Sequence, residues 1–289
     1  MSSIKDRQRA AARARLEKEM SERAEEAKKR RQRQAIIGSA LAVVVIAGVS
    51  VWLVTALKSD DKKPDASGAP PAGTVACTWK PEDPQGGSKI TDVGTPPANA
   101  PNVGTDTMTI DTNLGKITAA VDKSKAPCTA AAFEFLAGKK FWDGTKCHRL
   151  TTEGIKVLQC GDPSAKGAGY RQTDGTGGPS FRYAEENLPT GVGGPGSPST
   201  PPSAPPAAAY PKGTIAMANT GQEGSSGSQF FICWDDVQLN PTYTILGTVT
   251  AGLDIVEKVG KAGSDNANSA GDGHPKTEVN IKTLQMARA

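Results

Sequence analysis

The sequence predicts a mainly β domain, a barrel or a sandwich, that follows a long uncharged segment near the N-terminus. After residue 104, most candidate elements are short runs of alternating apolar and polar residues, and only two stretches are typical of helices. Hydrophobic residues make up 37% of the 289 residues, which is enough for one real core, and Gly and Pro are concentrated in a few stretches. We therefore expect one compact domain with tails.

The first 34 residues form a strongly charged arm. They hold 12 Lys and Arg against 6 Asp and Glu and contain neither Gly nor Pro, so a solvated helix is expected. Because the whole chain carries a net charge of +4, the remaining 255 residues carry −2, which argues against a nucleic-acid-binding domain. Contact of the arm with anionic lipid or nucleic acid is the alternative to a solvated juxtamembrane helix.

A hydrophobic segment follows at residues 35–57 and contains no charged residue. Its length, at ~1.5 Å per residue, covers ~34 Å, enough for a ~30 Å hydrocarbon core. Trp52 stands near its C-terminal end, and three arginines flank its N-terminal end. The positive-inside rule then predicts a single-pass protein of the cell membrane, with a cytoplasmic arm and an extracytoplasmic domain. A cleaved signal peptide is the competing interpretation, although the apolar run exceeds the ~7–15 residues usual there.

Residues 58–104 are typical of a disordered linker. Eight prolines are scattered among Gly, Ala, Ser and Asp, and such a composition cannot bury enough apolar surface to order itself. Cys77 interrupts this stretch and indicates that part of it is pinned to the domain. A second stretch crowded with Pro and Gly, residues 188–211, is expected to be an insertion that does not pack.

The domain, residues 105–289, is divided into elements by alternation and turn residues. A β-hairpin is predicted around the turn at residues 112–115, because apolar and polar residues alternate on both sides of it. A helix is predicted next, with Pro127 suited to its first turn and Gly138 closing it. The later elements are strands at 146–150, 155–160, 215–218, 230–232, 242–249 and 278–286, and a short helix at 253–259.

Five short motifs within the domain carry a family resemblance. They are Cys-His-Arg-Leu at 147–150, Leu-Gln-Cys-Gly-Asp at 158–162, Asp-Gly-Thr-Gly-Gly at 174–178, Met-Ala-Asn at 217–219 and Gly-Ser-Gln-Phe-Phe-Ile at 227–232. In this order, over residues 105–286, they resemble the cyclophilin family of peptidyl-prolyl isomerases, in particular membrane-anchored extracytoplasmic members from actinobacteria. The resemblance implies an eight-stranded antiparallel barrel capped by two helices. It also implies isomerisation of X-Pro bonds in secreted or cell-surface proteins, in a groove on the outer face.

The resemblance further assigns roles to single residues. Arg149 is the catalytic residue, because an always charged fork can hold the substrate carbonyl and help localise the lone pair on the proline nitrogen. No cofactor is implied, and the only two histidines lie more than a hundred residues apart, which argues against a zinc site. The substrate-binding residues are Val157, Phe231 and Leu239 around the proline ring, with His148, Gln159, Met217, Ala218, Asn219, Gln229 and Tyr243 beside them.

Some positions depart from the family pattern. Arg149 and Gln159 are two residues further apart than usual, and Ile155 or Lys156 replaces an aromatic residue of the proline pocket. Gln238 stands where many members have Trp, which argues against strong cyclosporin binding more than against catalysis. The main alternative is therefore a noncatalytic proline-peptide binding module or chaperone. A third hypothesis is a scaffold in which the charged arm matters more than the barrel.

Five cysteines leave at least one unpaired in a monomer. Outside the cytoplasm disulfides are plausible. Cys147 and Cys160 flank the predicted catalytic strands, where they either bridge, act as a redox switch, or remain small buried hydrophobic residues. The pairing stays open at the level of sequence.

Overall fold

The computed structural model describes residues 69–82, 89–190 and 209–289, which belong to one compact unit, Ala69–Ala289. Predictions for the charged arm, for the apolar segment 35–57 and for the middle of the 188–211 insertion concern residues outside these ranges. Within the described ranges, no helix is long and apolar enough to cross a bilayer.

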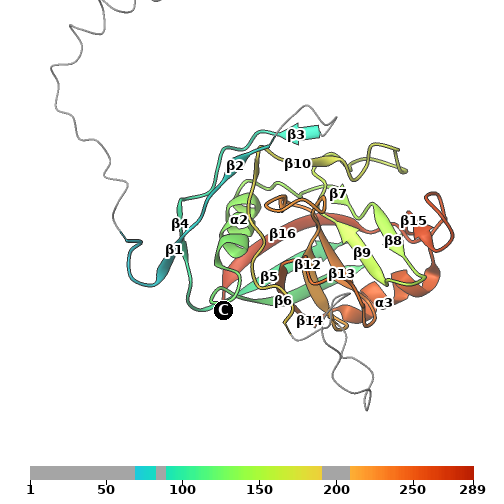
Figure 1. The fold of residues 1–289 in the computed structure, drawn as a ribbon. Helices are drawn as coiled ribbons and strands as arrows, with labels where there is room; N and C mark the ends of the chain where they lie inside the picture. The colour runs from blue at the N-terminus through green and yellow to red at the C-terminus, as the bar shows by residue number, and fades with distance from the viewer. Residues whose placement is uncertain (1–68, 83–88, 191–208) are drawn as a thin grey trace, which may run out of the picture. The chain divides into compact units, whose positions relative to one another are not determined.

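One curled antiparallel sheet forms the body of the domain (Figure 1). Strand β7 (Thr145–Lys146) lies at one end of the sheet, and β8 (Arg149–Thr151) is the second strand from the other end. Only Cys147 and His148 separate these two strands in the chain, so the chain itself joins the two ends of the sheet. Mainly β architecture was predicted and is confirmed, and two two-residue strands add to the predicted eight. The strand order is β15 (Asp272–Gly273), β8 (Arg149–Thr151), β9 (Val157–Cys160), β13 (Phe230–Cys233), β12 (Thr214–Met217), β14 (Ile245–Ala251), β6 (Gly115–Asp122), β5 (Thr105–Thr112), β16 (Asn280–Arg288) and β7 (Thr145–Lys146).

Two helices accompany the sheet, as predicted. Helix α2 (Pro127–Gly138) begins with a proline, whose missing N–H costs nothing in a first turn, and buries Phe133 and Leu136. Helix α3 (Leu253–Ala262) lies between two glycines and extends three residues beyond its predicted end. Its apolar face buries Val256 and Val259 against the sheet, so α3 follows from amphipathic spacing.

Alternation along the strands separates two apolar clusters. Side chains on successive residues of a strand point to opposite faces. On β13, Phe230 and Ile232 therefore join the large interior core, whereas Phe231 and Cys233 join a smaller cluster on the outer face. On β12, Met217 faces the interior and Ala216 the outer cluster. The outer face of β9, β13 and β12 is consequently the surface available to a ligand.

A segment predicted to be linker is folded onto the domain. Residues 69–82 and 89–104, hereafter the strap, run past α2 in Figure 1. The strap's strands are β1 (Thr74–Ala76), β2 (Lys80–Pro81), β3 (Lys89–Thr91) and β4 (Asn99–Pro101). Strand β1 pairs with β4, β2 with β11 (Phe181–Arg182), and β3 with β10 (Gly177–Pro179). The prediction of a disordered linker is therefore wrong for these residues, and the domain begins 36 residues earlier than expected.

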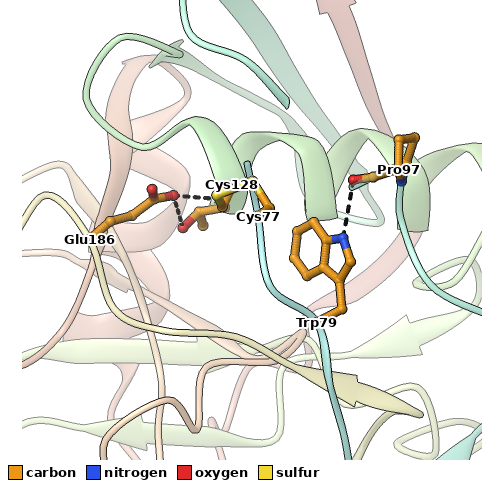
Figure 2. Close-up of a disulfide and its surroundings, with 6 residues drawn as sticks. Cys77, Trp79, Pro97, Cys128 and Glu186 are labelled. Carbon is orange, nitrogen blue, oxygen red and sulfur yellow. Dashed lines mark hydrogen bonds between the residues drawn. A yellow bond between two sulfur atoms is a disulfide. The ribbon is translucent and has the colours of Figure 1, made fainter. Parts of the chain in front are cut away.

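Covalent and aromatic contacts hold the strap in place (Figure 2). A disulfide joins Cys77 to Cys128 in the first turn of α2. Two residues further on, the Trp79 ring meets the rings of Phe181 and Tyr183 edge-on at 5.4 and 5.5 Å between centroids. The Trp79 indole N–H donates a hydrogen bond of 3.1 Å to the carbonyl of Pro97 in the same strap. The composition of the segment gave a wrong prediction because a disulfide and the Trp79 ring stabilise its folded position, which its few apolar residues could not do alone.

The C-terminal end of the predicted insertion also packs. Ala209 and Tyr210 are buried in the outer cluster, which corrects the expectation that residues 188–211 stay free of the domain. The Tyr210 hydroxyl lies 3.1 Å from the carbonyl oxygen of Tyr243, to which it donates, and 3.0 Å from the Tyr243 backbone N–H, from which it accepts. Tyr210 thereby ties the end of the insertion to the loop that carries Tyr243.

The remaining cysteines resolve the open question of pairing. Cys147 and Cys160 form a second disulfide, which links the start of the β8 region to the end of β9. Cys233 is free and buried, and its burial raises the pKa of the thiol to about 12. Because the thiolate is the reactive form, Cys233 is an inert core thiol near neutral pH.

Candidate active site

A row of four residues crosses the outer face of the sheet. Arg149 on β8 lies opposite Gln159 on β9, Gln159 lies opposite Phe231 on β13, and Phe231 lies opposite Ala216 on β12. Neighbouring strands lie about 4.8 Å apart, so Arg149 and Phe231 are about 10 Å apart along this row. A fixed positive charge thus stands beside an apolar surface at a spacing set by the sheet.

Arg149 is held by two partners. Its Nε and Nη2 atoms donate to the two carboxylate oxygens of Asp272 at 2.9 and 2.6 Å, and its Nη1 donates to Gln159 Oε1 at 3.3 Å. A guanidinium has five N–H donors, so these three bonds leave two N–H groups for a ligand. The hydrogen bonds from Arg149 hold the pKa of Asp272 below its ordinary value. The guanidinium is consequently charged and fixed in direction, and 37% of the side chain is exposed.

A relay of hydrogen-bonded amide side chains continues from Arg149 to residues 174–178, hereafter the Gly-rich loop. Gln159 Nε2 donates to Gln229 Oε1 at 3.0 Å. Gln229 Nε2 donates in turn to the carbonyls of Gly175 and Gly177 at 2.8 and 2.9 Å. The motifs around Arg149, Gln159, Gln229 and Gly175 are therefore parts of one hydrogen-bonded unit, although they are separated in the sequence.

The Gly-rich loop depends on a buried carboxylate. Asp162 is fully buried, and its Oδ2 accepts the Gly175 N–H at 2.6 Å. Gly175 has φ +94°, a conformation that L side chains rarely adopt, and a Cβ at Gly177 would collide with the Asp162 carboxylate. Asp162, Gly175 and Gly177 thus shape the loop whose carbonyls accept the hydrogen bonds of Gln229.

The outer apolar cluster contains most of the predicted proline pocket. Phe231 and Val157 are buried in it, and Tyr243 meets the Phe231 ring edge-on at 5.6 Å. Ala218 and Leu239 pack on the same cluster and are partly buried. The structure therefore brings these five predicted residues to one surface beside Arg149.

The altered loop after Arg149 has one apolar contact with this cluster. Ile155 packs against it, whereas Lys156 forms an ion pair of 2.6 Å with Asp235 and lies over the Trp234 ring. Of the two residues, Ile155 is thus the one that adds to the apolar surface around Phe231. Gln238 is exposed and accepts a bond of 3.4 Å from the Ala209 N–H.

Two predicted site residues lie elsewhere. Met217 is fully buried in the interior core, because it alternates with Ala216 and Ala218 on β12. His148 is buried behind the loop at Gly175 instead of lying at a pocket rim, and burial lowers its pKa to about 4. Both assignments to substrate binding are therefore corrected: each residue faces away from the groove, where it supports the elements that carry the site.

Asn219 has its amide committed to the fold. Its Nδ2 donates to the Thr242 carbonyl at 2.8 Å, and its Oδ1 accepts the Gly221 N–H at 3.0 Å. Asn219 also lines a cavity of about 320 Å³ next to the row of four residues, together with Gln159, Gln229 and the Gly-rich loop. The Asn219 side chain thus braces the loop at Thr242, and its binding of the substrate stays a prediction.

Sequence reasoning missed Asp272 and the strap. Asp272 lies 123 residues from Arg149 in a Gly-rich stretch, and its pairing with β8 is what brings the two together. An Arg beside apolar strands is expected to have an acidic partner, but the spacing of acidic residues along the sequence does not show which one it is. Among the described residues, no cluster of three or more His, Cys, Asp or Glu side chains is arranged to hold a metal ion.

Comparisons with known proteins point to one family. A family model described as cyclophilin type peptidyl-prolyl cis-trans isomerase/CLD matches residues 107–286. A probable peptidyl-prolyl cis-trans isomerase B of Mycobacterium leprae is 41% identical over 196 residues, which cover 66% of this chain and 61% of that protein. The protein of the same name from Mycobacterium tuberculosis H37Rv is 41% identical over 177 residues, covering 61% of this chain and 52% of that one.

Among solved structures, a cyclophilin type peptidyl-prolyl cis-trans isomerase of Cryptosporidium parvum, crystallised in the presence of the dipeptide Ala-Pro, is similar at 23% identity and a TM-score of 0.47. The match covers 63% of this chain and 99% of that one. The matched regions thus span only about half to three fifths of the mycobacterial relatives. On the family match over residues 107–286, the chain belongs to the cyclophilin type peptidyl-prolyl cis-trans isomerase family.

Proposed function

We propose that this protein catalyses cis/trans isomerisation of X-Pro peptide bonds. The observation that carries the proposal is the position of Arg149, fixed by Asp272 and Gln159, two strands away from the apolar cluster around Phe231. X-Pro bonds populate both the cis and the trans form and interconvert slowly enough to limit folding, so they are the peptide bonds that require a catalyst, and the apolar cluster offers a surface for the proline ring.

The chemistry requires no covalent step. Rotation about the amide has a barrier of ~18–20 kcal/mol because resonance gives the C–N bond partial double-bond character. A proline ring held on Phe231 would keep one end of the bond still while the other end turns. The two free N–H groups of Arg149 would hold the rotating carbonyl and favour the twisted state, in which the nitrogen lone pair is localised. Every group needed belongs to this chain.

Location and clients are part of the proposal. The uncharged segment 35–57 and the arginines before it support a single membrane anchor with the domain outside the cytoplasm. The two disulfides support the same side, because such bonds persist in oxidising compartments. Secreted and cell-surface proteins with X-Pro bonds would then be the substrates.

The test is the isomerisation rate of an Ala-Pro peptide with the full chain in detergent micelles. Arg149→Ala should lower kcat/KM by about 10²-fold or more, on the order of 3 kcal/mol of transition-state stabilisation. Arg288→Ala, an exposed arginine at the end of β16, is the matched control and should leave the rate unchanged. A folded wild-type chain that binds the peptide without speeding its isomerisation would instead be a binding module.

A further inference from the structure

The strap forms one wall of the cavity beside the row of four residues. Glu82 and Ile90 line this cavity of about 320 Å³ together with Ala218 and Asn219. Both strap residues are half-buried. The cavity therefore does not belong to the barrel alone, because a segment that precedes the family-matched region, residues 107–286, completes it.

The wall is built by pairing with the Gly-rich region. Ile90 pairs in register with Gly178, and the Glu82 N–H donates a hydrogen bond of 3.0 Å to the carbonyl of Ser180. Further along, the Asp92 carboxylate accepts the Ser180 hydroxyl at 2.9 Å. These contacts, with the disulfide at Cys77 shown in Figure 2, set the strap residues against the cavity.

Glu82 is the acidic group that this wall offers to a ligand. Within the described ranges, no hydrogen bond or ion pair engages its carboxylate. The nearby Glu185 is committed, since its two oxygens accept the N–H groups of Gly224 and Ser225 and the Ser226 hydroxyl. Of the nearby cations, Lys89 Nζ donates to the Thr173 hydroxyl, and Lys80 makes no ion pair with Glu82 in this part of the chain.

The chemistry of the wall fits a long cationic side chain. Ile90 offers an apolar surface for a methylene stem, and Glu82 offers a negative charge for the terminal ammonium or guanidinium group. A peptide whose proline lies on Phe231 advances ~3.4 Å per residue in extended form, so the cavity next to Gln159 and Gln229 is reached two to four residues from the proline.

We propose that Glu82 and Ile90 make this cavity a subsite for Lys or Arg in the peptide, so that the strap selects substrates with a basic residue near the X-Pro bond. The inference rests on the proposed peptide binding at Arg149. It assigns to the strap a role in recognition in addition to its attachment to α2. Removal of the Glu82 charge should therefore change which peptides are preferred and leave the isomerisation step itself intact.

The experiment uses the full chain in detergent micelles and alanine-based Ala-Pro peptides. Each peptide carries a single Lys, Gln or Glu, placed two, three or four positions from the proline on one side or the other. At one of these positions, the kcat/KM of the wild type for the Lys peptide should be about fivefold above that for the Gln peptide, the scale of a partly exposed ion pair. The preference should decline as salt rises. Glu82→Gln should abolish it, and Glu82→Lys should favour the Glu peptide.

Glu223→Gln is the matched control, because Glu223 is an exposed carboxylate on the neighbouring loop that does not line the cavity. It should keep the Lys preference. Equal rates for Lys and Gln peptides in the wild type, or equal losses in Glu82→Gln and Glu223→Gln, would overturn the proposal. Binding of fluorescein-labelled peptides, measured by anisotropy, separates the proposed isomerase activity from the proposed subsite. If no peptide is isomerised, the proposed activity fails, and the relative affinities for the Lys and Gln peptides still show whether the subsite exists.

Discussion

The carboxylate of Asp272 accepts two hydrogen bonds from the Arg149 guanidinium, from Nε at 2.9 Å and from Nη2 at 2.6 Å. Asp272 is itself oriented, because Asn268 Nδ2 donates to its Oδ1 at 3.0 Å. Short pairing of β15 with β8 sets Asp272 opposite Thr151, two residues along the strand from Arg149, within reach of the guanidinium. A two-point contact fixes the plane of the guanidinium as well as its position, which a single bond cannot do.

Asp272 should therefore act as a positioning residue for Arg149. We expect Asp272→Asn to lower kcat by about tenfold with little change in KM, because the misdirected guanidinium loses contact mainly in the twisted state. Asp272→Glu should recover part of the rate. Asp254→Asn, which breaks an exposed ion pair with Lys258 on α3, serves as the control and should have no effect. Full activity in Asp272→Asn would contradict this role.

The amide relay predicts a second effect. Gln229→Ala removes the donor to the carbonyls of Gly175 and Gly177 and leaves Gln159 without its acceptor. We expect a loss of about tenfold in kcat/KM, and less than additive losses in the double variant with Arg149→Ala, because the residues act as one unit. Gln222→Ala, at an exposed position, is the control. Strictly additive losses would show that the relay does not reach Arg149.

His148 predicts a pH dependence of stability. Burial lowers its pKa from 6.5 to about 4 and outweighs the opposing effect of the Asp162 and Asp174 carboxylates. Below about pH 6.5, His148 binds a proton in the unfolded chain but not in the folded chain, so the free energy of unfolding falls as pH drops. The decrease between pH 6.5 and pH 4 should reach about 3 kcal/mol.

Urea unfolding of the wild type and of His148→Gln at several pH values gives the free energy of unfolding as a function of pH. The difference between the slopes of the two curves measures the contribution of His148. The variant should lose the part of the slope that lies between the two pKa values. His274→Gln, which changes the only other histidine, should retain it. Parallel curves for wild type and His148→Gln would mean that His148 is not buried in its neutral form.

The strap disulfide predicts a change in global stability. Cys77 and Cys128 are 51 residues apart, whereas Cys147 and Cys160 are 13 apart. Loop-closure entropy gives roughly 4 kcal/mol for the first and roughly 3 kcal/mol for the second. Replacing each pair by serines should lower the free energy of urea unfolding in that order. The Cys77 and Cys128 double variant should also lose the Lys preference assigned to Glu82 while retaining isomerisation of a plain Ala-Pro peptide.

Local pattern was sufficient for much of the domain. Apolar alternation located the strand around Phe231, and Pro127 and Gly138 located the two ends of α2, because both signals depend on neighbours in the chain. The motifs also brought Arg149, Gln159 and Gln229 into one hypothesis, and the structure joins them by hydrogen bonds.

Pattern was not sufficient to orient every residue. Met217 belongs to a motif of the groove but faces the core, because strand alternation and not motif membership decides which way a side chain points. His148 adjoins Arg149 in the chain but is buried, because it precedes β8 and lies against the loop at Gly175.

The sequence by itself determined the β class, the two helices, the family and the main residues of the site, since each is written in short-range spacing. Only the tertiary structure decided that Asp272 holds Arg149 and that the strap reaches the cavity through Glu82. Both depend on segments far apart in the chain that meet through sheet pairing and a disulfide. Composition records neither of these long-range constraints, which is why a Pro-rich segment could be mistaken for a free linker.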